Sequence, residues 1–187
     1  MPPSKTYFQE PVPIWPEAPR LSPHKSFPAY RYVPGLNPHP SRDPQGHSHY
    51  VPPDRWRENE EYLHGIDLYH QSYFWESHEV WEGLWHLTDK EGPEGQWLQG
   101  LIQNSAALLK VHQHLWDAAR HLSQKSYRRL TFVMNAGVDS SEGRYMGISV
   151  KDLLKDMESY YRPLWIKEDL RVVAVRIEGR PPRLIPA

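Results

Sequence analysis

The chain has 187 residues, 39% of them hydrophobic and 8 of them tryptophan, which is enough for one core of ordinary domain size with a polar remainder. Its 22 basic and 23 acidic residues give a formal net charge of −1, so no global positive field would hold a nucleic-acid backbone or an anionic membrane. The absence of cysteine excludes disulfides, thiolate metal ligands and a cysteine nucleophile.

The apolar segments are all short. None approaches the roughly 18–20 residues that cross a bilayer, and the first residues lack the apolar stretch of a secretory signal. We therefore expect a cytoplasmic protein that binds neither membranes nor nucleic acids.

Residues 1–53 are predicted to form a proline-rich extended arm. Fourteen of the 19 prolines fall in this range, and proline removes a backbone donor and disfavours helix at the residue before it. The arm also carries more aromatic side chains than a solvated linker usually has, which are Tyr7, Phe8, Trp15, Phe27, Tyr30 and Tyr32. We therefore expect the arm to dock on the helical body.

Residues 54–162 are predicted to form an all-α bundle of about five helices, because apolar residues recur there at spacings of three and four. Asp54, Ser72 and Ser149 are the expected N-caps of the first, second and fifth helices. Pro163 is expected to end the fifth. The helices are expected at about 54–70, 72–87, 94–112, 115–135 and 149–162.

Residues 163–187 are predicted to form a C-terminal extension with a short β-like strand. The stretch LRVVAVRIEG at 170–179 is rich in valine and is followed by prolines. A lone strand leaves backbone groups unpaired, and AYRYV at 29–33 has the most β-like composition elsewhere. We therefore predict a two-stranded ribbon between these segments, or else pairing across a dimer.

The segment FWESHEVWEGLWH at 74–86 holds the unusual polar residues. Advancing 100° per residue places His78 and Glu82 in one stripe with large aromatic side chains, while Glu79 lies at its edge and Glu76 well away. An aromatic stripe normally faces the core, where an unpaired carboxylate costs several kcal/mol. We therefore expect His78 and Glu82 to point inward and to pair with each other or with common partners. The aromatic members are Phe74, Trp75, Trp81 and Trp85.

The third helix supplies polar partners for this pair. Gln99 and Gln103 lie beside small residues that permit close helix approach, and an amide can both donate and accept. We predict a buried polar network of His78, Glu82, Gln99 and Gln103 between the second and third helices, with Glu76 as a further member.

The two blocks FWESHEVWEGLW and QWLQGLIQNSAALLK resemble the DUF309 family, also called TTHA0068-like. Its pattern is an aromatic residue, Glu, a small residue, His-Glu, two residues, Glu, two residues and Trp, followed later by Gln-Gly-Leu-Ile-Gln. The looser similarity extends over about residues 58–135. The resemblance implies a small helical bundle and no particular reaction, because the family is one of unknown function. The matching positions are Phe74, Glu76, His78, Glu79, Glu82, Trp85, Gln99, Gly100 and Gln103.

A divalent transition metal is an alternative use of the same residues. The spacing His78-Glu79-x-x-Glu82 differs from the metalloprotease helix, which has histidines at i and i+4, because Glu82 takes the second ligand position. His78 and Glu82 are candidate ligands, with His70 or the arm as a third. Glu79 is the candidate base of a metal-assisted hydrolase.

The arm offers His39, His47 and His49 as further candidate ligands. A His-x-His pair in an extended segment places both rings on one side, because side chains alternate along it. The competing interpretation is a docked turn, in which the Asp-Pro-Gln-Gly sequence at 43–46 supplies the bend.

Two functions of different classes therefore follow from the sequence. The first is a non-enzymatic structural or interaction module, with a homodimer as the candidate assembly, in which the polar network specifies packing. The second is the metal-dependent hydrolase. No serine-nucleophile or phosphate-loop motif is present, and the sequence indicates no particular small-molecule ligand.

Overall fold

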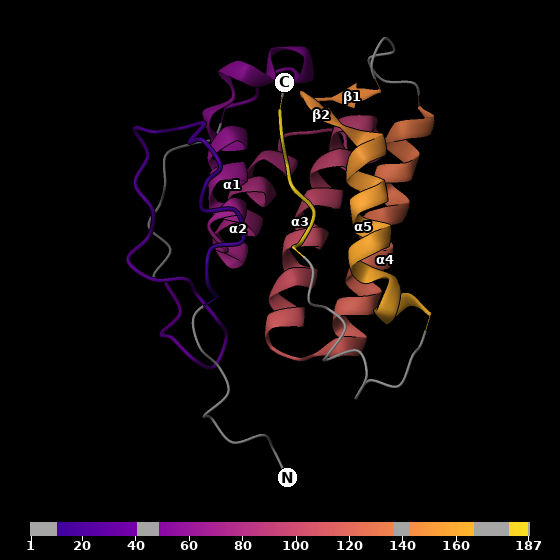
Figure 1. Ribbon diagram of the computed structural model, residues 1–187. Helices are drawn as coiled ribbons and strands as arrows, with labels where there is room; N and C mark the ends of the chain where they lie inside the picture. The colour runs from indigo at the N-terminus through magenta and orange to yellow at the C-terminus, as the bar shows by residue number, and fades with distance from the viewer. Residues whose placement is uncertain (1–10, 41–48, 137–142, 167–179, 187) are drawn as a thin grey trace.

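The computed structural model describes residues 11–40, 49–136, 143–166 and 180–186, and Figure 1 shows a bundle of helices with irregular segments along one side. The predicted all-α fold is confirmed. The helices are η2 (a 3₁₀ helix, Pro53–Glu58), α1 (Glu60–His70), α2 (Phe74–Trp85), α3 (Pro93–His112), α4 (Trp116–Asn135) and α5 (Val150–Trp165). A short antiparallel hairpin of β1 (Arg144–Tyr145) and β2 (Ile148–Ser149) lies at the upper end of the bundle in Figure 1.

The helices pack in chain order. α1 contacts α2, α2 contacts α3, α3 contacts α4, and α4 contacts α5. The largest fully buried side chains include Trp81 of α2, Trp97 of α3 and Tyr161 of α5, so all three helices turn aromatic surface inward. The bundle core therefore lies between successive helices, with α3 near its centre.

A buried chain of hydrogen bonds crosses this core. The hydroxyl of Tyr161 donates to Oδ1 of Asn104 at 2.8 Å, and Nδ2 of Asn104 donates to the hydroxyl of Tyr69 at 3.1 Å. The Tyr69 hydroxyl donates in turn to the carbonyl of Pro182 at 2.8 Å. Each side chain in this series thus has a hydrogen-bond partner, and the series of hydrogen bonds joins α5, α3, α1 and the C-terminal segment.

The first predicted helix is divided at Asn59, and its predicted N-cap is wrong. Asp54 lies inside the short helix η2, whereas Oδ1 of Asn59 accepts the backbone N–H of Tyr62 at 3.0 Å and caps α1. A capping residue needs non-helical backbone angles, and Asn59 has φ −86° and ψ 86°. The chain therefore leaves helical geometry at this residue before α1 begins.

Ser72 does not cap α2. Its φ of 62° places it in the left-handed region, and its hydroxyl donates to the carbonyl of Val12 at 2.6 Å. α2 begins two residues later, at Phe74. Ser72 therefore holds the N-terminal arm, because its side chain points to the arm and not to the first turn of the helix.

The predicted cap of the last helix is confirmed, and its predicted end is wrong. Ser149 accepts the backbone N–H of Asp152 at 3.2 Å and starts α5. Pro163 lies within α5, which continues to Trp165. A proline inside a helix cannot donate to the carbonyl four residues earlier and its ring crowds that carbonyl, and α5 ends two residues after Pro163.

The arm lies against α1 and α2, and the predicted ribbon is not formed on its side. Residues 29–33 form no strand. The backbone N–H of Tyr32 donates instead to Oε1 of Glu76 at 2.8 Å, and those of Ile14 and Trp15 donate to the carbonyl of His70. The predicted strand at 170–179 lies outside the described residues.

The described tail pairs with the hairpin. Pro186 forms an antiparallel bridge with Ile148 of β2, so residues 180–186 make their β-like contact with the hairpin.

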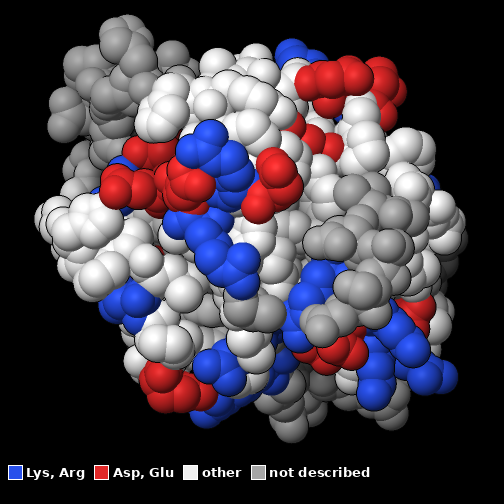
Figure 2. All heavy atoms as spheres, turned by 90° about the horizontal axis from the view of Figure 1, so that it is seen from above, with Lys and Arg blue, Asp and Glu red and all other residues white. Residues whose placement is uncertain are grey.

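In residues 11–40, 49–136, 143–166 and 180–186, no helix is both long and apolar enough to cross a membrane. On the face seen from above in Figure 2, basic and acidic side chains lie beside one another among uncharged residues.

Candidate functional site

A cluster of three metal-ligating side chains lies on α2. One ring nitrogen of His78 and one carboxylate oxygen each of Glu79 and Glu82 lie within 4.8 Å of one another. The grouping follows from the helix, because residues at i and i+4 are neighbours on its surface and i+1 lies beside them. Within the described ranges, these are the residues at which three His or acidic donors come this close.

The ring of His78 has an unsatisfied nitrogen. Nδ1 lies 3.3 Å from Oε1 of Glu79, but without hydrogen-bond geometry, and Nδ1 is buried without another partner. The ring packs against Trp75 with centroids 5.4 Å apart, which sets its orientation. A buried ring nitrogen normally has a partner, so this atom points to a ligand or a water between the two side chains.

The cluster lies at the margin of the core and not inside it, contrary to the predicted inward orientation. His78, Glu79 and Glu82 are all partly exposed. The buried face of α2 contains Ser77, whose hydroxyl lies 2.9 Å from that of Ser105 on α3. These small residues let the helices approach on that side. The buried residues of α2 are Phe74, Glu76, Ser77, Trp81 and Leu84.

Glu76 is buried, although the helical wheel placed it well away from the expected core face. It is 9% exposed and accepts the N–H of Tyr32 from the arm at 2.8 Å. The wheel was misleading because the arm, and not another helix, covers this side of α2. Glu76 therefore connects α2 to the arm.

The two glutamines lie in α3 at half-buried positions. In the described part of the chain, no direct hydrogen bond joins Gln99 or Gln103 to His78 or Glu82, and Oε1 of Gln103 is buried without a partner. A network that includes them would have to run through water, and it stays a prediction.

The other candidate metal ligands lie apart from this cluster. Nε2 of His70 accepts the backbone N–H of Leu184 at 3.3 Å. His39 packs edge-on against Trp75, with centroids 5.5 Å apart, and its Nδ1 lies 2.8 Å from the carbonyl of Pro40. His49 is exposed, and His47 lies outside the described residues.

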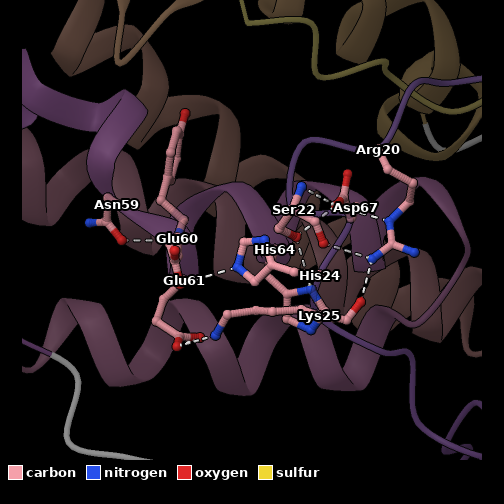
Figure 3. A network of polar contacts seen from close by, with 10 residues as sticks. Arg20, Ser22, His24, Lys25, Asn59, Glu60, Glu61, His64 and Asp67 are labelled. Carbon is pink, nitrogen blue, oxygen red and sulfur yellow. Dashed lines mark hydrogen bonds and ion pairs between the residues drawn. The ribbon is translucent and has the colours of Figure 1, made fainter.

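Sequence reasoning missed the most highly connected carboxylate, Asp67 of α1 (Figure 3). It accepts Nε of Arg20 at 3.1 Å, the backbone N–H of Leu21 at 2.9 Å, and the backbone N–H and hydroxyl of Ser22 at 2.8 and 2.7 Å. Its side chain is 1% exposed. Four donors around one buried carboxylate fasten the arm to α1.

The meeting of Ser22, His64 and Asp67 is not a nucleophilic triad. The hydroxyl proton of Ser22 goes to Asp67, so Nδ1 of His64, at 3.2 Å, must donate to the serine oxygen. In a triad the histidine accepts that proton. Ser22 is also only 1% exposed, so the group is structural. The spacing His64-x-x-Asp67 on one helix face was the signal available in the sequence.

An outer pair of ionic contacts supports the same junction (Figure 3). Nζ of Lys25 lies 2.5 Å from Oε1 of Glu61, and Nε2 of His24 lies 3.3 Å from Oε2 of Glu60. The first contact is half-buried and the second is exposed, and pairs near the surface contribute little each, so the buried Asp67 contacts dominate the junction.

His70 joins both ends of the described chain to α1. Its carbonyl accepts the N–H groups of Ile14 and Trp15, and its imidazole accepts the N–H of Leu184. Burial and, to a smaller extent, the neighbouring Arg183 lower the pKa of this imidazole from 6.5 to about 4. The folded protein therefore holds His70 in its neutral form.

Because the pKa of His70 is lowered on folding, we expect the free energy of unfolding to fall by about 2 kcal/mol as the pH is lowered from 7 to 5. The unfolded chain binds a proton near pH 6.5 and the folded chain only near pH 4. The contribution of His70 is thus complete above pH 6.5 and is lost as pH falls. Urea denaturation of the wild type and His70→Gln at several pH values measures it. The variant keeps an acceptor for Leu184 without titrating, and equal pH slopes would contradict the expectation.

The comparisons with known proteins identify one family. Residues 62–122 match the family model described as "Domain of unknown function (DUF309)", which confirms the resemblance. The matched range contains nearly all of α1, all of α2 and α3 and the beginning of α4, and therefore the His78 cluster. The chain matched no curated protein and no solved structure.

Proposed function

We propose that the protein is a helical module that binds one divalent transition metal through His78, Glu79 and Glu82. The observation that carries the proposal is the approach of three donor atoms to within 4.8 Å of one another on one helix. The unsatisfied Nδ1 of His78, facing Glu79 at 3.3 Å, supports it independently.

The donor set suits such an ion. One imidazole and two carboxylates are ligands typical of zinc, iron and manganese. Donors around these ions lie about 3–3.5 Å apart. Nδ1 of His78 and Oε1 of Glu79 are already 3.3 Å apart, so only the longer separations in the cluster would have to shorten on binding. All three are partly exposed, which leaves them room to do so.

Three protein ligands leave at least one coordination position open. An ion with an open position can polarise a substrate oxygen or lower the pKa of a bound water, which is the chemistry of the predicted hydrolase. Because a carboxylate oxygen of Glu79 lies within 4.8 Å of the other two donor atoms, we assign Glu79 as a ligand and not as the base.

A structural or interaction module is the second candidate, and the contact between Glu76 and the N–H of Tyr32 favours it. In this function the polar residues of α2 position the arm and no metal is needed. The predicted homodimer and the cytoplasmic location belong to both candidates and stay predictions.

Metal titration separates the two candidates. Protein without a histidine tag, stripped with a chelator, is titrated with Zn²⁺, Mn²⁺ and anaerobic Fe²⁺ by calorimetry. We expect one equivalent to bind, and we expect His78→Ala and Glu82→Gln to weaken binding at least about 10-fold, since each removes a direct ligand.

The matched controls are His121→Ala on α4 and Glu91→Gln in the α2–α3 connection, both at exposed positions. They should bind the metal like the wild type. Stoichiometric binding that survives both ligand substitutions, or no binding tighter than millimolar by the wild type, would rule out the proposed site. Circular dichroism establishes that each variant keeps its helices.

A further inference from the structure

A pocket of about 690 Å³ lies at the end of the bundle that carries η2 and the β1–β2 hairpin. Its lining residues come from η2, the connection between α2 and α3, the first turn of α3 and the hairpin, together with Tyr50. The His78 cluster is not among its lining residues. The volume is that of a small-molecule site, which typically measures about 300–1,000 Å³.

Three aromatic side chains line the pocket, those of Tyr50, Trp56 and Tyr145. Trp56 and Tyr145 are 8% and 4% exposed, so packing holds both rings in place. Gly147 of the hairpin lies directly on the indole, because a Cβ there would be 2.4 Å from Cζ2 of Trp56. Its φ of 82° also favours glycine. The turn of the hairpin thus builds a rigid aromatic wall.

The charged lining is predominantly acidic. It contains three carboxylates, on Asp54, Asp89 and Glu94, and one guanidinium, on Arg57. The Arg57 guanidinium lies 4.3 Å from the centroid of the Trp56 ring, so a resident cation already occupies one aromatic face. A ligand with negative charge would meet an unfavourable field here.

Of the three carboxylates, Glu94 is the one best placed to contact a bound cation. It is half-buried in the first turn of α3 and accepts the hydroxyl of Tyr50 at 3.1 Å. Among the described residues no basic side chain forms an ion pair with it. Burial raises the pKa of its carboxyl group, so a cation close to Glu94 would stabilise the ionised form.

We propose that this pocket binds a small organic ammonium ion that carries an apolar group. The ammonium would lie beside Glu94 and the ring of Tyr50, which is 52% exposed, where ionic attraction and the quadrupole of that ring add. The apolar group would contact Leu87, which is 43% exposed, and the buried Met146. The inference does not depend on the metal site.

The test uses three probes of one shape and different charge, 2-phenylethylammonium, 2-phenylethanol and phenylacetate, with benzyltrimethylammonium as a second cation. Binding is followed by calorimetry and by NMR of the tryptophan indole N–H signals. We expect saturable binding of the cations that shifts the Trp56 signal. The alcohol should bind at least about 10-fold more weakly, and the carboxylate should not bind.

Glu94→Gln keeps the shape of the side chain and removes its charge. It should lower the affinity for both cations about 10-fold and leave that for the alcohol nearly unchanged. Glu91→Gln, which makes the same change outside the pocket, should bind all probes like the wild type. Equal affinity for the three charge types, shifts that avoid Trp56, or no saturable binding of either cation would overturn the proposal.

Discussion

Replacing Asp67 by alanine is expected to lower the free energy of unfolding by about 3–5 kcal/mol, because it removes one partner from a buried charge cluster. Arg20, Leu21 and Ser22 would all lose their acceptor at once, and unsatisfied buried donors are costly. Urea denaturation followed by tryptophan fluorescence measures the change.

The control for this variant is Asp117→Ala. Asp117 also contacts an arginine, Arg120, but lies exposed on α4, and a surface pair of this kind contributes about 1 kcal/mol or less. Similar losses in the two variants would show that the Asp67 contacts do not hold the arm. Limited proteolysis gives a second readout, because residues 11–40 should be cleaved faster in Asp67→Ala than in the control.

Gly65→Ala is expected to destabilise the protein by about 3 kcal/mol, although alanine is the better helix former by about 1 kcal/mol. The new Cβ would lie 2.1 Å from Nε1 of Trp81. The indole is fully buried and donates to the carbonyl of Tyr62 at 3.2 Å, so it has no space into which to move. Thermal and urea unfolding of the variant measure the loss.

The comparison for this prediction is Gly100→Ala in α3. A Cβ there would lie 2.7 Å from Cδ2 and 2.9 Å from Cγ of Leu130, which are longer approaches than the 2.1 Å at Gly65 and involve a more flexible side chain than an indole. We expect Gly100→Ala to be less destabilised than Gly65→Ala by about 1 kcal/mol or more, as is typical of such packing effects. An unaltered or more stable Gly65→Ala protein would be incompatible with the packing described for Trp81.

The grouping of the candidate ligands was available from the sequence. His78, Glu79 and Glu82 are on one helix at i, i+1 and i+4, so any α-helix through these residues places them together. How deeply these three side chains are buried could not be predicted from the sequence. The arm covers Glu76, and the contact between Ser77 and Ser105 turns another face of α2 inward.

The proposed ammonium pocket was also beyond sequence reasoning. Trp56, Glu94 and Tyr145 lie in three segments that are distant in the sequence, and each segment contributes several residues to the pocket lining. Nothing in the spacing within any of these segments distinguishes its residue from an ordinary surface or core position.

By itself the sequence determined the helices and the irregular arm. Helix formation depends on neighbours three and four residues away and on local caps such as Ser149, and proline acts on its own and the preceding residue, so these signals are written within a few positions. Tertiary structure alone decided the partners of the buried polar groups. Asp67 meets Ser22 across 45 residues of chain, and such pairs form only where packing brings distant segments together.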